Sequence, residues 1–102
     1  MYAQELYNKI IEVINSSTVN KSGKQLKWNI YRQIKEYGRF YRQQAETARI
    51  REGINRPTED EINIHQMLAL VTKDKYTDAM TVDEYKNHIK NSINMIMNKN
   101  IK

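Results

Sequence analysis

The segment from Lys24 to Glu52 constrains the fold more than any other part of the sequence. On a helical projection its apolar residues gather within about 60° of Ile30, the pattern of an amphipathic helix. As one continuous helix it would measure about 40 Å, more than the diameter of a 100-residue domain. We therefore expect either a kink at Gly38 or an end that projects beyond the rest of the protein. The apolar residues are Leu26, Ile30, Ile34, Tyr37, Tyr41, Ala45 and Ala48.

Three shorter segments, at residues 2–15, 58–71 and 81–98, repeat apolar residues at the same helical spacing. In the second of these segments Ile62 and Leu70 fall off the main stripe, which indicates burial on more than one side. The expected core positions, segment by segment, are Ala3, Leu6, Tyr7, Ile10 and Ile14; Ile64, Met67, Leu68 and Val71; and Val82, Tyr85, Ile89, Ile93 and Ile96.

Capping and turn residues divide these segments. Thr58 with Glu61, and Thr81 with Glu84, are spaced as capping boxes, in which a threonine and an acidic side chain satisfy free N–H groups of a first helical turn. The chain holds only three Gly and one Pro, too few for the frequent turns of an all-β fold. The sequence predicts an all-α fold, a compact bundle of about four helices, with one domain over residues 1–102.

The residues that catalysis or metal binding would need are missing or isolated. Cysteine is absent, which excludes thiol chemistry and cysteine-bound zinc. The two histidines, His65 and His88, have no partner at metal-ligand spacing. Residues 74–85 resemble a calcium loop in charge, but Ala79 stands where Gly is required and Tyr85 where a bidentate Glu is required. We expect neither an enzyme nor a bound metal or cofactor.

The sequence shows no segment suited to a membrane. No apolar run approaches the roughly 20 residues of a membrane helix, and the start of the chain lacks the basic and apolar regions of a signal peptide. A cysteine-free chain rich in Asn, Ile and Lys is typical of a cytoplasmic protein from an AT-rich phage or mobile element. We therefore expect a cytoplasmic protein with no membrane partner.

The net charge of +5 is distributed unevenly along the chain. Residues 21–51 hold nine Lys or Arg and two Glu, whereas residues 52–85 hold three basic and eight acidic residues. Within the long segment the cations lie on the side opposite the apolar stripe, and two aromatic residues lie with them. This surface, extended by a lysine on the preceding loop, is our candidate binding site: Lys21, Lys24, Trp28, Tyr31, Arg32, Lys35, Arg39, Arg42 and Arg49.

Trp28 is the least expected member of this surface, because an exposed indole is unfavourable unless something covers it. Three explanations stand side by side. The indole could stack on a nucleobase, fill a pocket on a partner protein, or pack under the loop at residues 15–24 of its own chain.

Two functions fit a cationic and aromatic helix surface. The first is nucleic-acid binding, with the cations on phosphates and Trp28 or Tyr31 against a base. The alternative is inhibition or regulation of a protein with an acidic surface, because Trp, Tyr and Arg are the residues most enriched at binding hot spots. An inhibitor of a host enzyme or defence complex, such as an anti-CRISPR protein, is the sharpest form of that alternative.

A homodimer is compatible with either function. Six residues of the long segment repeat at alternating spacings of four and three, as the contact positions of a coiled coil do. A helix longer than its own bundle could pair with a copy of itself through these positions. They are Ile30, Ile34, Tyr37, Tyr41, Gln44 and Ala48.

Overall fold

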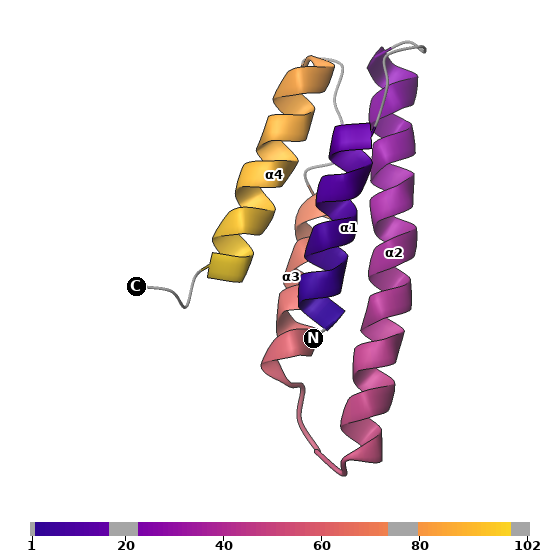
Figure 1. Ribbon diagram of the computed structural model, residues 1–102, viewed down its shortest axis with the longest axis vertical. Coiled ribbons are helices and arrows are strands. Elements are labelled where there is room, and N and C mark those ends of the chain that lie inside the picture. The colour runs from indigo at the N-terminus through magenta and orange to yellow at the C-terminus, as the bar shows by residue number, and fades with distance from the viewer. Residues whose placement is uncertain (1, 17–22, 74–79, 99–102) are drawn as a thin grey trace.

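The computed structural model describes residues 2–16, 23–73 and 80–98. It contains four helices, α1 (Tyr2–Ser16), α2 (Gly23–Arg51), α3 (Glu59–Lys73) and α4 (Val82–Asn98). Each helix contacts the other three, and the most extensive contacts are those of α2 with α1 and α3 (Figure 1). The described residues contain no strand. The predicted all-α bundle of about four helices is confirmed.

One face of every helix contributes to a common core. Most of the predicted stripes are found there, and Val13 joins them. Tyr37 and Tyr41 are only partly buried and pack against the edge of the core, as do Tyr7, Val82 and Ile96. The buried apolar residues are Ala3, Leu6, Ile10, Val13 and Ile14 of α1; Leu26, Ile30, Ile34 and Ala45 of α2; Ile64, Met67 and Val71 of α3; and Tyr85, Ile89 and Ile93 of α4.

The prediction for α3 is wrong at one position. Leu70 packs partly against the core, but Ile62 remains 42% exposed. Ile62 lies in the first turns of α3 and lines an open groove with Arg42 and Pro57, so its side chain faces solvent instead of joining the core. A residue off the main stripe is buried only if a neighbouring helix is long enough to cover it. The periodicity of one helix does not predict how far its neighbours extend.

The long helix α2 projects beyond the bundle and is helical through Gly38. Its 29 residues correspond to about 43 Å at the rise of an α-helix, and the longest dimension of the molecule is 47 Å. In Figure 1 the C-terminal end of α2 extends past the N-terminus of α1. Of the two arrangements that the sequence allowed, the projecting end is the one observed.

Gly38 allows α3 to approach α2 closely. A Cβ atom at this position would lie 2.0 Å from Cδ2 and 2.7 Å from Cγ of Leu68, far inside van der Waals contact. The glycine is therefore needed for packing between the two helices, and the close contact brings the basic side of α2 next to α3.

The ends of α2 and α4 follow the local signals in the sequence. Gly53 has a φ of 74°; its N–H donates to the carbonyl of Ile50 (3.0 Å) and the N–H of Ile54 donates to that of Arg49 (3.2 Å). These are the two hydrogen bonds of a Schellman motif. At the start of α4 the capping box is reciprocal, because Thr81 Oγ1 accepts from the Glu84 N–H (3.1 Å) and Glu84 Oε1 accepts from the Thr81 N–H (3.2 Å).

Candidate nucleic-acid interface

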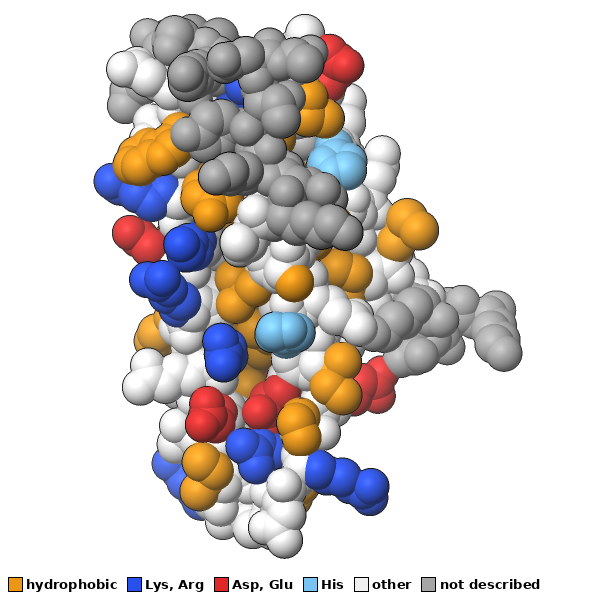
Figure 2. Space-filling view, turned by 180° about the vertical axis from the view of Figure 1, so that it is seen from behind, with side chains coloured by type: hydrophobic (Ala, Val, Ile, Leu, Met, Phe, Trp, Pro, Cys, Tyr) orange, Lys and Arg blue, Asp and Glu red, His pale blue; other side chains and the backbone are white. Residues whose placement is uncertain are grey.

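Four cationic side chains form a row along the side of α2 that borders α3. Arg32, Arg39 and Arg42 are exposed and Lys35 is half-buried. They are separated by three, four and three residues, so the row is about 15 Å long at the helical rise. Figure 2 shows Lys and Arg side chains following one another down this side of the molecule. We call Arg32, Lys35, Arg39 and Arg42 the basic row.

The row borders an open groove between α2 and α3. Lys35, Arg39 and Arg42 line it from α2, and they face His65, Leu68, Ala69 and Thr72 of α3. His65 is exposed and also lines the adjoining groove with Arg42 and Gln66. No local pattern predicts that His65 lies beside the cations, because it is more than twenty residues from them in the chain and only the packing of α3 on α2 brings them together.

Each of the two aromatic rings in the predicted site lies next to a cationic side chain from the following turn of α2. The guanidinium carbon of Arg32 lies 5.2 Å from the ring centroid of Trp28, and Lys35 Nζ lies 5.9 Å from that of Tyr31. These are cation–π distances at i, i+4 spacing. Trp28 is nevertheless 41% exposed, whereas Tyr31 packs partly against the core. Arg32 therefore covers part of the indole. This contact is not among the three explanations that the sequence analysis offers for Trp28.

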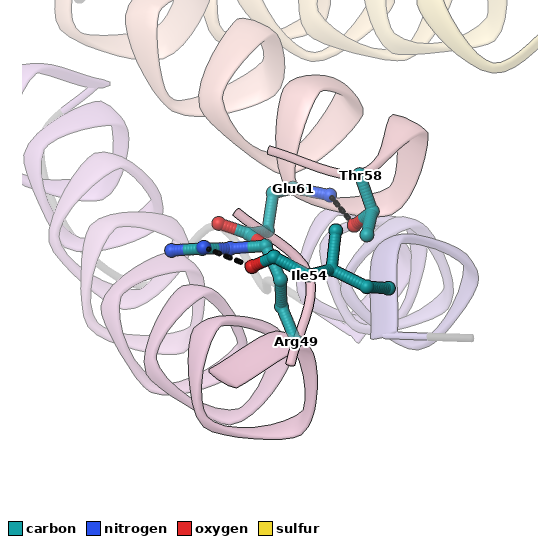
Figure 3. Close-up of polar contacts among 4 residues, drawn as sticks. All are labelled: Arg49, Ile54, Thr58 and Glu61. Atoms are coloured by element: carbon teal, nitrogen blue, oxygen red, sulfur yellow. Dashed lines mark hydrogen bonds and ion pairs between the residues drawn. The ribbon is translucent and has the colours of Figure 1, made fainter. Parts of the chain in front are cut away.

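Arg49 belongs to the corner between α2 and α3 (Figure 3). Its Nε lies 2.6 Å from Glu61 Oε1, with the two side chains only 18% and 13% exposed. One of its terminal nitrogens also donates to the carbonyl of Ile54 (3.0 Å). Because this charge-assisted contact holds the guanidinium within the protein, we place Arg49 in the structural framework and leave it out of the proposed contact surface.

Lys27, next to Trp28 in the sequence, is likewise turned inward. It is 3% exposed, and its Nζ donates to the carbonyl of Met80, just before α4 (2.6 Å). Of the other candidate residues, Lys21 lies outside the described residues, and Lys24 is described only as part of the α2 backbone. The basic row is thus the part of the predicted site that the structure brings together.

The acidic residues at the start of α3 are engaged within the protein. Asp60 accepts hydrogen bonds from the backbone N–H groups of Tyr2 (3.1 Å) and Ala3 (2.8 Å), so it caps α1 across the bundle. Glu61 faces Arg49. Thr58 accepts from the Glu61 N–H (3.3 Å), so the Thr58 half of this capping box is formed while the glutamate side chain turns to the arginine. The contact with Arg49 neutralises Glu61, and Asp60 directs its carboxylate to the start of α1.

Two glutamates of α2 lie close to the row. Glu36 is 4.0 Å from Arg32, in an exposed i, i+4 pair, which is weak because water screens it. Glu46 lines a shallow surface groove with Arg39, Arg42 and Gln43. The row therefore keeps a local excess of positive charge.

Phe40 is a surface residue outside the predicted site. It is 54% exposed, and its ring meets Tyr41 edge to face with 5.2 Å between centroids. The sequence signal was its direction, about 80° from the centre of the apolar stripe, which predicts a residue at the margin of the core.

Most of the residues predicted to form a homodimer contact are instead packed in or against the core of their own chain. Ile30 and Ile34 are fully buried in the core, and Tyr37 and Tyr41 pack against it. Gln44 and Ala48, toward the projecting end of α2, keep partial exposure. Self-association through this seam stays a prediction, limited to the projecting end.

The described residues hold no group of three or more His, Asp or Glu side chains arranged to bind a metal. Within the same ranges, every helix is too short or too polar to cross a lipid bilayer.

The fold and the surface together define an all-α bundle with a cationic, partly aromatic face on one long helix. Comparison with known proteins finds no matching family model, no similar curated protein and no similar solved structure.

Proposed function

We propose that this protein binds nucleic acid through the basic row on α2. The observation that supports this most is the regular spacing of four cations, three of them exposed and one half-buried, along one helix. The row presents four cations along one line about 15 Å long, so it can contact successive phosphates of one nucleic-acid strand. Guanidinium groups are suited to this contact because their planar donors fit phosphate oxygens.

The surroundings of the row favour an anionic ligand. Arg39 and Arg42 form no ion pair with the described part of the chain, and the Arg32 pair with Glu36 is long and exposed. In the acidic segment that follows α2, two carboxylates are directed at groups within the protein, Asp60 at the start of α1 and Glu61 at Arg49. His65 and Thr72 add hydrogen-bonding groups across the groove.

The proposal predicts a strong dependence on salt. Each neutralised phosphate releases counterions, and four contacts would lower the affinity by about a hundredfold between 50 and 200 mM salt. We would measure binding of labelled DNA and RNA, single-stranded and duplex, by fluorescence anisotropy across this range. The absence of binding to all of them at 50 mM salt would refute the proposal.

A charge-matched pair of variants tests the location. Arg39→Glu/Arg42→Glu reverses two charges in the row, and Arg51→Glu/Arg56→Glu reverses two exposed charges at the projecting end of the bundle. Both change the net charge equally, so the long-range attraction of the whole protein falls by a similar amount in each. We expect the first to abolish binding and the second to weaken it only slightly. Equal losses would place the contact elsewhere.

Inhibition of a protein with an acidic surface is the second candidate. The exposed rings of Trp28 and Phe40 favour it, since aromatic residues beside arginines are typical of binding hot spots. Under this alternative Trp28→Ala would release a single host protein that co-purifies with the wild type, and nucleic acid would not bind at 50 mM salt.

A further inference from the structure

The exposed face of α2 is asymmetric in charge. Its basic row lies on the flank toward α3. The opposite flank, beside the basic row, carries uncharged residues that are exposed or half-buried. Its charged neighbours are Glu36, between the two flanks, Arg51 at the end of α2, and Lys9 of α1, which lies over the ring of Tyr37. We call this side the neutral flank, and it comprises Asn29, Gln33, Phe40 and Thr47.

This asymmetry disfavours a helix seated in the major groove of a duplex. That groove is about 12 Å wide, close to the diameter of a helix with its side chains, so phosphates line both flanks of an inserted helix. Favourable contacts would then need cations on both sides. On α2 the second flank offers amides, a hydroxyl and a ring, and α1 and α3 already cover much of the helix.

A single strand presents the complementary asymmetry, with phosphates along one side and bases along the other. The exposed rings of α2 suit the bases. Trp28 and Phe40 are 41% and 54% exposed, and their positions in the helix are about 18 Å apart along its axis. Phe40 lies on the neutral flank, and Trp28 precedes the basic row by one turn. Proteins that bind single strands combine these two elements, a track of cations and aromatic rings for stacking.

We infer that the ligand of this surface is single-stranded nucleic acid, held by its phosphates on the basic row and by base stacking on Phe40 and Trp28. The inference rests on the proposed function and specifies its ligand. Arg32 already lies over Trp28, so a base would approach the uncovered part of the indole while the guanidinium edge stays available for a phosphate.

The test compares the single strands dT12 and rU12 with a mixed-sequence DNA duplex of 12 base pairs, all at 50 mM salt. We expect at least one single strand to bind at least tenfold more tightly than the duplex and to quench Trp28, the one tryptophan of the chain. The two single strands separate DNA from RNA preference. Phe40→Ala should weaken single-strand binding roughly tenfold. Ile50→Ala, which truncates another exposed apolar residue of α2 (61% exposed), should have no effect.

The outcomes separate this inference from the proposed function. Duplex binding as tight as single-strand binding, or an unchanged affinity in Phe40→Ala, would overturn the inference and leave nucleic-acid binding in place. Failure of all three ligands to bind at 50 mM salt would overturn both. Circular dichroism and urea unfolding of Phe40→Ala would establish that a loss of binding is not a loss of folding.

Discussion

Arg42 and Arg49 lie two helical turns apart on the same side of α2, yet they meet different neighbours on α3. Arg42 is exposed and lines the grooves beside His65. Arg49 is mostly buried and contacts Glu61, one turn before His65. Because α2 and α3 pack extensively against each other, the residue of α3 that lies opposite each arginine determines whether the charge stabilises the fold or remains available to a ligand.

Cations on one basic stripe can therefore have two different roles, one in stabilising the fold and one in binding a ligand. Residue spacing on α2 places both arginines on the same side of the helix, and only the neighbouring helix distinguishes them. A cation opposite a carboxylate is neutralised and ordered. Arg42 shares its grooves with Glu46 and Glu61 as well as with His65, but it forms no ion pair with the described residues and so keeps its hydrogen-bonding capacity toward solvent.

The largest expected effect is the loss of the Arg49–Glu61 contact. Glu61→Gln leaves a mostly buried guanidinium without its counter-charge, so we expect the free energy of unfolding to fall by about 2–3 kcal/mol. Arg42→Met, in contrast, should change it by less than about 0.5 kcal/mol. Urea denaturation followed by circular dichroism measures both. If the two substitutions cost the same, the distinction between the arginines is wrong.

The next effect concerns the contact that holds α2 against α3. Gly38→Ala improves helix propensity by about 1 kcal/mol, but its Cβ would overlap Leu68, and overpacking of this kind typically costs about 1–3 kcal/mol. We expect a net loss of up to about 2 kcal/mol in urea denaturation. The added substitution Leu68→Ala should cost less in the Gly38→Ala background than in wild type, because it removes the overlap. Simple additivity of the two changes would show that the helices do not meet at Gly38.

A substitution on α3 should neutralise Arg42 within the protein, as Glu61 neutralises Arg49. His65→Glu places a carboxylate beside Arg42, as Glu61 lies beside Arg49, so it should reduce nucleic-acid affinity about tenfold and lower the salt dependence by about one phosphate contact. His65→Gln is the control, since it is neutral and leaves Arg42 available. Anisotropy titrations at several salt concentrations measure both quantities. An affinity for His65→Glu equal to that of His65→Gln would mean that Arg42 does not contact the ligand.

The parts of this structure that the sequence predicts are those set by residues close together in the chain. The apolar stripes and the reciprocal box of Thr81 and Glu84 depend on neighbours within about five residues. The contacts of Asp60 with the start of α1 and of Arg49 with Glu61 join different helices. Gly38 likewise suggested a kink until its contact with Leu68 was seen.

The smallest expected effect comes from the two capping boxes, which share a sequence pattern but not a geometry. Glu84 returns to its own threonine, whereas Glu61 turns to Arg49. Thr81→Ala should therefore lower the free energy of unfolding by about 1 kcal/mol, and Thr58→Ala, whose hydrogen bond is longer at 3.3 Å, by less. Serine at either position keeps the accepting oxygen and should restore most of the loss in urea denaturation. A serine variant as unstable as the alanine variant would show that the threonine methyl, and not the cap, stabilises the helix start.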